Sequence, residues 1–278
     1  MTTANGPETW LVDAFTSHRG GGNQAAVVAL SAPAPDSWLS ATAADLALPV
    51  TTYFFPEEDG CIRLRWFAPS GELPSCGHGS LAAAAVLIEE RGYRGPVTFD
   101  TALGLLTARR TRDGIELTVP AQVTRPWELP GWAIEALGIS PLETRRSERH
   151  ALVRVASQSD VDSIEPDLRA LAGLPTVGLA VTAPGTGRFD LVSRWFVPRE
   201  GIEDQATGTA HAMLAPYWCE RTGRSQLVAQ QRSARGGEFE LTVDRGQVTL
   251  WGQAIVTVHG NLSDRPPADG GDPRNEIR

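Results

Sequence analysis

Short apolar runs recur along the whole chain, and Gly, Pro and Asp residues separate them. Runs of about four to eight residues that are rich in Val, Ile, Leu, Phe and Thr are typical of β-strands. Asp113-Gly114 and Asp244-Arg245-Gly246 have the composition of tight turns, so each predicts a hairpin. The expected strands cover residues 10–15, 25–30, 52–55, 62–67, 97–100, 105–109 and 115–119, and then 151–155, 177–181, 190–196, 238–243, 248–251 and 254–258.

Two long helical patterns, at residues 79–91 and 209–221, are apolar on nearly every side. A helix with so little polar surface is typical of a buried position, so we expect sheet to enclose each one. Weaker helical patterns cover residues 37–46 and 130–137. Together these elements predict an α+β fold in which each long helix is wrapped by a strongly bent sheet.

One sequence block occurs twice. Arg65-Trp66-Phe67-Ala68-Pro69 returns 129 positions later as Arg194-Trp195-Phe196-Val197-Pro198, and each copy precedes a Gly-containing loop and an apolar helix. If the second loop has two extra residues, Cys76 aligns with Thr207. A repeat of this length predicts two related half-molecules that face each other. We place the halves at residues 8–121 and 127–262, and we expect the Pro-, Asp- and Gly-rich tail at 263–278 to fray.

Composition narrows the class of protein. The chain has 278 residues, 41% of them hydrophobic and 21% charged, which is typical of a globular protein of two domains. Its net charge of -8 and its lack of a basic stripe argue against nucleic acid as a partner. The longest apolar runs are too short to cross a membrane, and the first residues lack a signal-peptide pattern. The three cysteines have no framework spacing, so we expect free thiols and a cytoplasmic protein.

The chain contains no lysine, because all 25 residues counted as Lys or Arg are arginine. A GC-rich genome is a sufficient cause, but the chemical consequence does not depend on the cause. Without a lysine amine the chain cannot form a Schiff base, and it cannot build the P-loop of nucleotide hydrolases. We therefore expect neither of these chemistries.

The loops before the two long helices contain small residues, with Gly77 and Gly79 in the first copy and Gly208 in the second. Glycine lets a ligand approach the backbone, and the first turn of a helix exposes unpaired N–H groups. Two such helix starts brought together by pseudo-symmetry would form a cradle for a carboxylate between the halves. The alternative is ordinary helix capping, with Ser80 and Thr209 as the caps.

Three side chains near these loops are candidates for the chemistry, each with a simpler alternative, and a fourth candidate lies in an earlier glycine-rich loop. Cys76 precedes the first helix, whose dipole lowers the pKa of a thiol, so it is either an acid/base group or a small buried apolar residue. His78 lies between two glycines and is either a titrating group or a turn residue. Asp204 is either a proton carrier or an acceptor for loop N–H groups. Asn23 follows three glycines and is a candidate to present its amide to a substrate.

The remaining Cys and His residues predict no further site. Cys61 and Cys219 fall at apolar positions of a strand and a helix, so we assign both to the core. His211, one position into the second helix, is either a packed helical residue or part of the site. No HxxxH or CxxC spacing occurs, so we expect no metal.

Three motifs, taken in order, resemble the phenazine-biosynthesis isomerase (PhzF-like) family, which has the diaminopimelate epimerase fold. The resemblance spans residues 10–260 and implies two pseudo-symmetric domains, each an antiparallel β-barrel around a central helix. It also implies a cofactor-free site in the cleft between the domains. By position, His78 and Asp204 resemble the family's polar site residues, and Gly77 and Thr209 resemble its substrate binders. The motifs are Val12-Asp13-Ala14-Phe15 with Gly22-Asn23, Glu72-Leu73-Pro74 with Gly77-His78, and Glu203-Asp204 with Thr207-Gly208-Thr209-Ala210-His211.

Two positions depart from that family's pattern. Val50 replaces the catalytic Glu of its L-S-E-T-T segment, and Cys76 stands where such chains carry a small residue. Cys76 resembles the first catalytic Cys of diaminopimelate epimerases and proline racemases, whose second Cys falls at Thr207. A Cys/Thr pair is similar to the pair in trans-3-hydroxyproline dehydratases. We expect Val50 to line the cleft as an apolar wall.

The expected activity depends on these proton carriers. Racemisation by two bases requires a carrier on each face of the carbon, and a Cys/Thr pair leaves one face without one. We therefore rank a proton shift with movement of a double bond first, β-elimination from a hydroxy amino acid second, and amino-acid racemisation or epimerisation third. Resemblance to isomerases of antibiotic pathways implies a small carboxylated substrate in secondary metabolism, such as a cyclic imino acid. A non-catalytic small-molecule binder and a homodimer both stay open.

Overall fold

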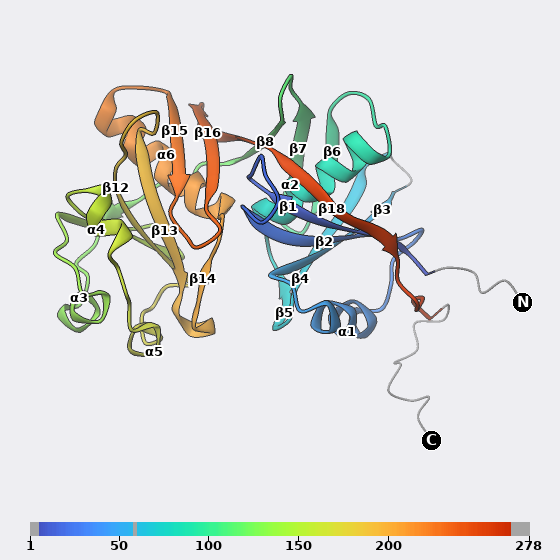
Figure 1. Ribbon diagram of the computed structural model, residues 1–278, viewed down its shortest axis with the longest axis horizontal. Helices are drawn as coiled ribbons and strands as arrows, with labels where there is room; N and C mark the ends of the chain where they lie inside the picture. Colours follow the sequence, from blue (N-terminus) through green and yellow to red (C-terminus); the bar gives the residue numbers. More distant parts are fainter. Residues whose placement is uncertain (1–5, 58–59, 268–278) are drawn as a thin grey trace, which may run out of the picture. The chain divides into compact units, whose positions relative to one another are not determined.

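The computed structural model describes residues 6–57 and 60–267 of the chain, which divides into two compact units (Figure 1). The described part of the first unit consists of residues 6–20, 24–57, 60–117 and 253–267, and the second consists of 21–23 and 118–252.

The predicted halves, 8–121 and 127–262, differ from these units in three places: residues 253–262 belong to the first unit, and residues 21–23 and 118–121 belong to the second. The first difference arises because β18 (Ala254–Asn261) pairs antiparallel with β1 (Glu8–Ala14). Residues 263–267 of the predicted tail follow β18 without regular structure, and 268–278 lie outside the described residues.

The sheet of the first unit is mixed. β2 runs parallel to β3 and β4 runs parallel to β6, whereas β3–β4, β4–β5 and β6–β7 are antiparallel. The expectation of an antiparallel sheet is therefore wrong for two pairs, because a helix crosses over between the partners of each parallel pair. The strands are β2 Asn23–Ala29, β3 Val50–Pro56, β4 Ile62–Ala68, β5 Gly71–Leu73, β6 Val97–Thr101, β7 Gly104–Arg110 and β8 Ile115–Pro120.

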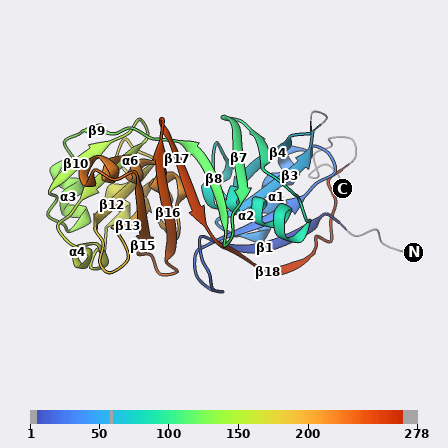
Figure 2. The same ribbon diagram turned by 90° about the horizontal axis from the view of Figure 1, so that it is seen from above.

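The second unit, whose strands β12, β13, β15, β16 and β17 are labelled in Figure 2, repeats this strand order. β11–β12 and β13–β15 are the parallel pairs, and β12–β13, β13–β14 and β15–β16 are antiparallel. The two extra residues expected in the second loop fall between β13 and β14, where a 3₁₀ turn forms at Pro198–Glu200. The strands are β9 Arg125–Pro126, β10 Glu143–Arg146, β11 His150–Arg154, β12 Gly178–Pro184, β13 Leu191–Val197, β14 Ile202–Asp204, β15 Gln226–Gln231, β16 Gly237–Asp244 and β17 Gln247–Gly252.

Each unit contains one long helix enclosed by its own strands, as predicted. In the first unit α2 (Gly77–Ala85) continues into a π-helical turn at Val86–Glu90, and all residues of α2 from His78 onward are buried. It contacts strands β1, β3, β7 and β18. In the second unit α6 (Gly208–Thr222) contacts β15, β16 and β17.

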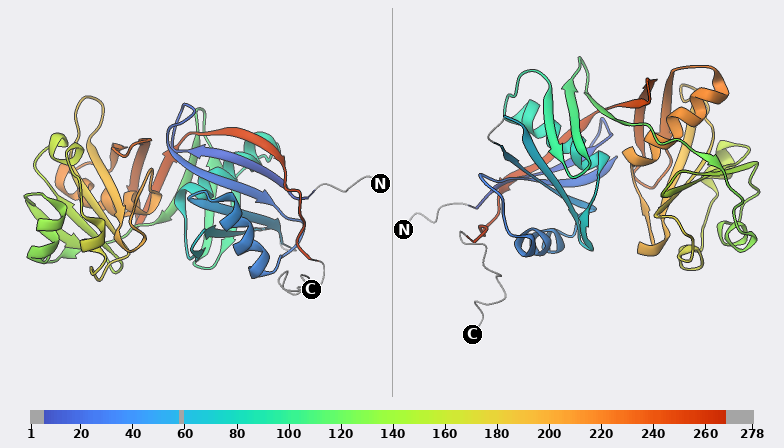
Figure 3. Two further views of the ribbon diagram at one scale, coloured as in Figure 1. Left: turned by 60° about the horizontal axis from the view of Figure 1, so that its bottom comes forward. Right: turned by 180° about the vertical axis from the view of Figure 1, so that it is seen from behind.

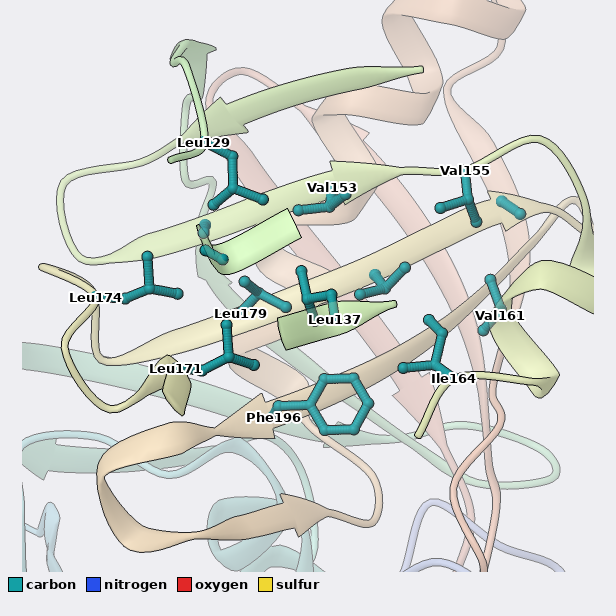
Figure 4. Close-up of a cluster of buried hydrophobic side chains, with 14 of the residues drawn as sticks. Leu129, Leu137, Val153, Val155, Val161, Ile164, Leu171, Leu174, Leu179 and Phe196 are labelled. Atoms are coloured by element: carbon teal, nitrogen blue, oxygen red, sulfur yellow. The ribbon is translucent and has the colours of Figure 1, made fainter. Parts of the chain in front are cut away.

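Shorter helices cover the outer faces of the sheets. In the first unit α1 (Asp36–Leu46) lies against the strands (Figure 3). Its Trp38 and Leu39 pack into a cluster with Tyr53 and Phe67. In the second unit α3 (Gly131–Leu137), α4 (Gln158–Asp162) and α5 (Leu168–Leu171) contribute to a cluster with β11, β12 and β13 (Figure 4). The central strands are therefore buried on both faces, which explains their nearly continuous apolar sequences. Among the residues described, no helix has the length and hydropathy to cross a membrane.

Candidate functional site

The two long helices begin at equivalent positions. Cys76 is the N-cap of α2 and Thr207 is the N-cap of α6, with similar extended backbones (φ -153°, ψ 107° and φ -117°, ψ 103°). The predicted alignment of Cys76 with Thr207 is thus confirmed. Ser80 and Thr209, the alternative caps, lie inside the first turns. Neither N-cap side chain makes a capping hydrogen bond, so neither competes in that way with a ligand for the first-turn N–H groups.

An equivalent Arg–Glu ion pair stabilises the hairpin before each of the two helices. Arg65 donates to Glu72 through Nε (2.7 Å) and Nη2 (2.8 Å), and Arg194 donates to Glu203 with the same two distances. Such bidentate pairs fix both partners in orientation. The β4–β5 and β13–β14 hairpins therefore position the helices that follow them, α2 and α6, in the same way.

A side chain of the same helix also forms a hydrogen bond with the carbonyl of each N-cap residue. Ser80 Oγ donates to the Cys76 carbonyl at 2.7 Å, and His211 Nδ1 lies 2.9 Å from the Thr207 carbonyl. His211 is fully buried and stacks on Phe239, with ring centroids 3.7 Å apart. Burial lowers the pKa of His211 to about 4, so its ring is neutral near pH 7 with Nδ1 as the donor. Of the two interpretations of His211, the packed helical residue fits these contacts.

Cys76 and His78 form a buried pair at the start of α2. The Cys76 Sγ lies 3.4 Å from His78 Nδ1 and 3.9 Å from Nε2, and each residue is 7% exposed. An imidazole at this distance can take the thiol proton, and the resulting ion pair opposes the cost of burying a thiolate. The lowered pKa of Cys76 stays a prediction, now with two physical causes, the helix dipole and His78.

Val50 lies against the first turn of α2. A Cβ built on Gly79 would lie 3.2 Å from Val50 Cγ1, 2.5 Å from Thr52 Oγ1 and 2.9 Å from Trp66 Cδ1. Gly79 therefore lets the helix approach β3 and β4 closely. Val50 is fully buried and packs beneath the helix start, and its place as an apolar wall of the cleft stays a prediction.

Asp204 lies at the centre of a hydrogen-bond network in the second unit. Asn23 Nδ2 donates to Asp204 Oδ1 at 2.6 Å, and Thr207 Oγ1 donates to Asp204 Oδ2 at 2.5 Å. Asn23 Nδ2 also lies 3.1 Å from the Ala206 carbonyl. The structure thus brings together three residues that the sequence analysis singled out, although Asn23 and Asp204 are 181 positions apart.

The loop that carries Asn23 is anchored to the same unit. Arg235 Nε donates to the Gly22 carbonyl and its Nη2 donates to the Gly21 carbonyl, both at 2.9 Å. The Gly22 amide donates to the Gly236 carbonyl at 3.0 Å. The glycine-rich loop therefore positions the Asn23 amide toward Asp204, and any contact of Asn23 with a substrate stays a prediction.

Gln231, at the end of β15, is a member of this network that the sequence analysis missed. It is fully buried, accepts from the Thr207 amide at 2.8 Å, and donates to the Asp204 carbonyl at 2.6 Å and to Thr207 Oγ1 at 3.2 Å. Its strand, Gln-Leu-Val-Ala-Gln-Gln, has too little apolar periodicity to be recognised, and no motif marks the residue. Only its tertiary contacts identify it.

A cavity of about 730 Å³ lies elsewhere in the first unit. Prolines line it together with Glu8, Arg91 and Arg265, and none of the predicted site residues reaches it. Within the described chain, no group of three or more His, Cys, Asp or Glu side chains is arranged to hold a metal ion.

Comparison with known proteins identifies relatives along nearly the whole chain. A family model described as phenazine biosynthesis-like protein (PhzC-PhzF) matches residues 12–260. An uncharacterized isomerase of Pseudomonas aeruginosa is 42% identical over 253 residues, covering 90% of this chain and 96% of that protein. An uncharacterized isomerase of Halalkalibacterium halodurans is 35% identical over 258 residues, covering 91% and 97%. The crystal structure of a PhzF-family phenazine biosynthesis protein from Enterococcus faecalis has a TM-score of 0.87 at 31% identity, covering 92% of this chain and 98% of that one. The resemblance in family and fold drawn from the motifs is confirmed.

Proposed function

Because this chain belongs to the phenazine biosynthesis-like protein family, in which related chains are named isomerases, we propose that it is a cofactor-independent isomerase. It moves a proton, with a shift of a double bond, within a small carboxylated metabolite. The observation that carries this proposal is the duplicated helix start, at which Cys76 is paired with His78 and Thr207 is paired with Asp204.

The first step uses the Cys76–His78 pair. His78 takes the thiol proton, and the Cys76 thiolate then removes a proton from a carbon next to a C=N or C=C bond of the substrate. The electron pair of the broken C–H bond moves into the conjugated system, and the proton returns at another carbon of that system. The first-turn N–H groups of α2, at Gly77 and Gly79, bind the substrate carboxylate.

A cyclic imino acid is the substrate class that suits this chemistry. Its C=N bond lies next to carbons whose protons are acidic, and its carboxylate suits the helix starts. Val50 leaves the family's carboxylate position apolar, so the reaction relies on Cys76 where its relatives rely on a Glu. We place such a reaction in the biosynthesis of a secondary metabolite.

Incubation in D₂O with a panel of carboxylated substrates tests this proposal. The panel contains 1-pyrroline-2-carboxylate, L-proline, trans-3-hydroxy-L-proline and diaminopimelate, with NMR and mass spectrometry as readouts. Deuterium uptake together with a shifted double bond supports the isomerase. Loss of water would instead identify a dehydratase, and inversion at Cα with deuterium uptake would identify a racemase or epimerase. Binding without exchange would identify a non-catalytic binder.

A further inference from the structure

The direction of the hydrogen bond between Thr207 and Asp204 follows from Gln231. Gln231 Oε1 faces the Thr207 N–H, which can only donate, and Gln231 Nε2 faces the Asp204 carbonyl, which can only accept. These two partners fix the orientation of the amide. Nε2 therefore donates to Thr207 Oγ1, 3.2 Å away, and the hydroxyl proton of Thr207 must point to Asp204 Oδ2 at 2.5 Å.

We propose that Thr207 relays a proton between the substrate and Asp204, and that Gln231 is the positioning residue that orients this relay. The inference rests on the proposed function and adds a second proton carrier to it. When the relay acts as a base, the substrate C–H bond breaks and its proton bonds to Thr207 Oγ1. The original Thr207 O–H bond breaks at the same time, and that proton bonds to Asp204 Oδ2. The reverse transfer returns a proton to the substrate.

The position and geometry of Thr207 support this role. Thr207 is the N-cap of α6, as Cys76 is the N-cap of α2, so the two candidate carriers occupy equivalent places at the duplicated helix starts. A distance of 2.5 Å is typical of a charge-assisted O–H···O⁻ bond, in which proton transfer needs little movement of the heavy atoms. Asn23 holds the other carboxylate oxygen at 2.6 Å, so Asp204 keeps Oδ2 toward the hydroxyl. A Cys/Thr pair thus has a carrier in each half, which revises the expectation from sequence.

Four variants separate a relay from a structural role. Thr207→Ser keeps the hydroxyl, Thr207→Val removes it at nearly the same volume, and Gln231→Met removes the donor that orients it. Thr222→Val is the matched control, because Thr222 lies at the other end of α6 and its hydroxyl bonds only a helix carbonyl, that of Trp218, at 2.8 Å. Circular dichroism and thermal melting establish that each variant is folded.

The first readout is exchange of 1-pyrroline-2-carboxylate protons in D₂O. Thr207→Val should slow exchange about 100-fold. Gln231→Met should lower kcat about 10-fold with little change in KM. Thr207→Ser and Thr222→Val should slow exchange less than about 5-fold. The relay moves the substrate C–H proton and the solvent-exchangeable Thr207 hydroxyl proton in one step. Wild type should therefore show both a substrate and a solvent isotope effect, and the solvent isotope effect should shrink in Gln231→Met. Full activity of Thr207→Val would overturn the relay. The relay would also be overturned if Thr207→Val were inactive while Asp204→Asn kept full activity.

A second readout does not depend on activity. The ¹³C resonance of the Asp204 carboxyl carbon, identified by its loss in Asp204→Asn, should move in Thr207→Val and Gln231→Met at pH 8 and stay in place in Thr207→Ser and Thr222→Val. If Thr207→Val leaves the resonance unchanged, the hydrogen bond is absent and the relay is refuted, whatever the enzyme does. If wild-type protein fails to exchange 1-pyrroline-2-carboxylate but the Asp204 resonance moves as expected, the proposed substrate class is wrong and the Thr207–Asp204 hydrogen bond is supported.

Discussion

Replacing Val50 by Glu tests whether this position, which resembles that of the family's catalytic Glu, can accept a carboxylate in this chain. Val50 is fully buried, and its Cγ1 would lie 3.2 Å from a Cβ on Gly79, so a new carboxyl group enters a packed site under the start of α2. Burial disfavours the charged form and raises the pKa of such a group. The replacement should therefore destabilise the protein. At a pH at which the carboxyl group ionises, its charge at the start of α2 should also disfavour the Cys76 thiolate and impair turnover.

The magnitude follows from linkage between protonation and folding. A Glu has a pKa of about 4.3 in the unfolded chain, and buried Glu side chains reach about 8. Because the pKa is raised in the folded state, the cost grows as the pH rises above the unfolded value. It amounts to about 1 kcal/mol at pH 5 and about 4 to 5 kcal/mol at pH 8, a difference of about 3 to 4 kcal/mol.

Urea unfolding at pH 5 and pH 8 measures this difference, with Val50→Gln as the control of similar shape and no charge. Val50→Glu should match Val50→Gln approximately at pH 5 and fall well below it at pH 8. Equal stabilities of the two variants at pH 8 would mean that the carboxylate is solvated, and the assignment of Val50 to a packed apolar site would be wrong. Turnover at or above the wild-type rate would mean that Val50 is remote from the chemistry.

Three further outcomes are expected. Iodoacetamide should modify Cys76 faster than Cys219, whose thiol pKa is raised by burial, and mass spectrometry should find Cys76 protected by bound substrate. Gly79→Ala should lower the free energy of unfolding in urea by more than about 2 kcal/mol, because its Cβ would lie 2.5 Å from Thr52 Oγ1. Gly131→Ala is the control and should be tolerated, because a Cβ at this position, at the start of α3, would have no atom within 4 Å. Burial lowers the pKa of His211 to about 4 in the folded protein, against about 6.5 in the unfolded chain, so the stability that its neutral ring contributes is complete above pH 6.5. About 2 kcal/mol of that stability should be lost between pH 8 and pH 5 in urea unfolding, and His211→Phe should lack that loss.

Local sequence signals predicted much of the fold. The strand at 62–67 was expected from its apolar run and is observed as β4 at Ile62–Ala68, and the helix expected at 209–221 is α6 at Gly208–Thr222. The alignment of Cys76 with Thr207 also came from local sequence, since it needed only the repeated block and two extra loop residues. These signals are local because hydrophobic periodicity and turn residues act within a few positions.

The unpredicted features depend on contacts between distant positions. β18 joins the first unit because it pairs with β1, about 250 positions earlier, and no local pattern encodes that pairing. β5 and β14 have three residues each, which is too short for a periodic signal. Gln231 belongs to the candidate site only through its bonds to Asp204 and Thr207.

The central claim is that the protein moves a proton of a small carboxylated substrate through Cys76. The rate of deuterium uptake by 1-pyrroline-2-carboxylate in D₂O, followed by NMR for wild type and Cys76→Ala, tests this most directly. We expect wild-type protein to exchange the substrate far faster than buffer alone, and Cys76→Ala to be slower by about 100-fold or more while its thermal melt is unchanged. Near-wild-type exchange by folded Cys76→Ala would contradict the account.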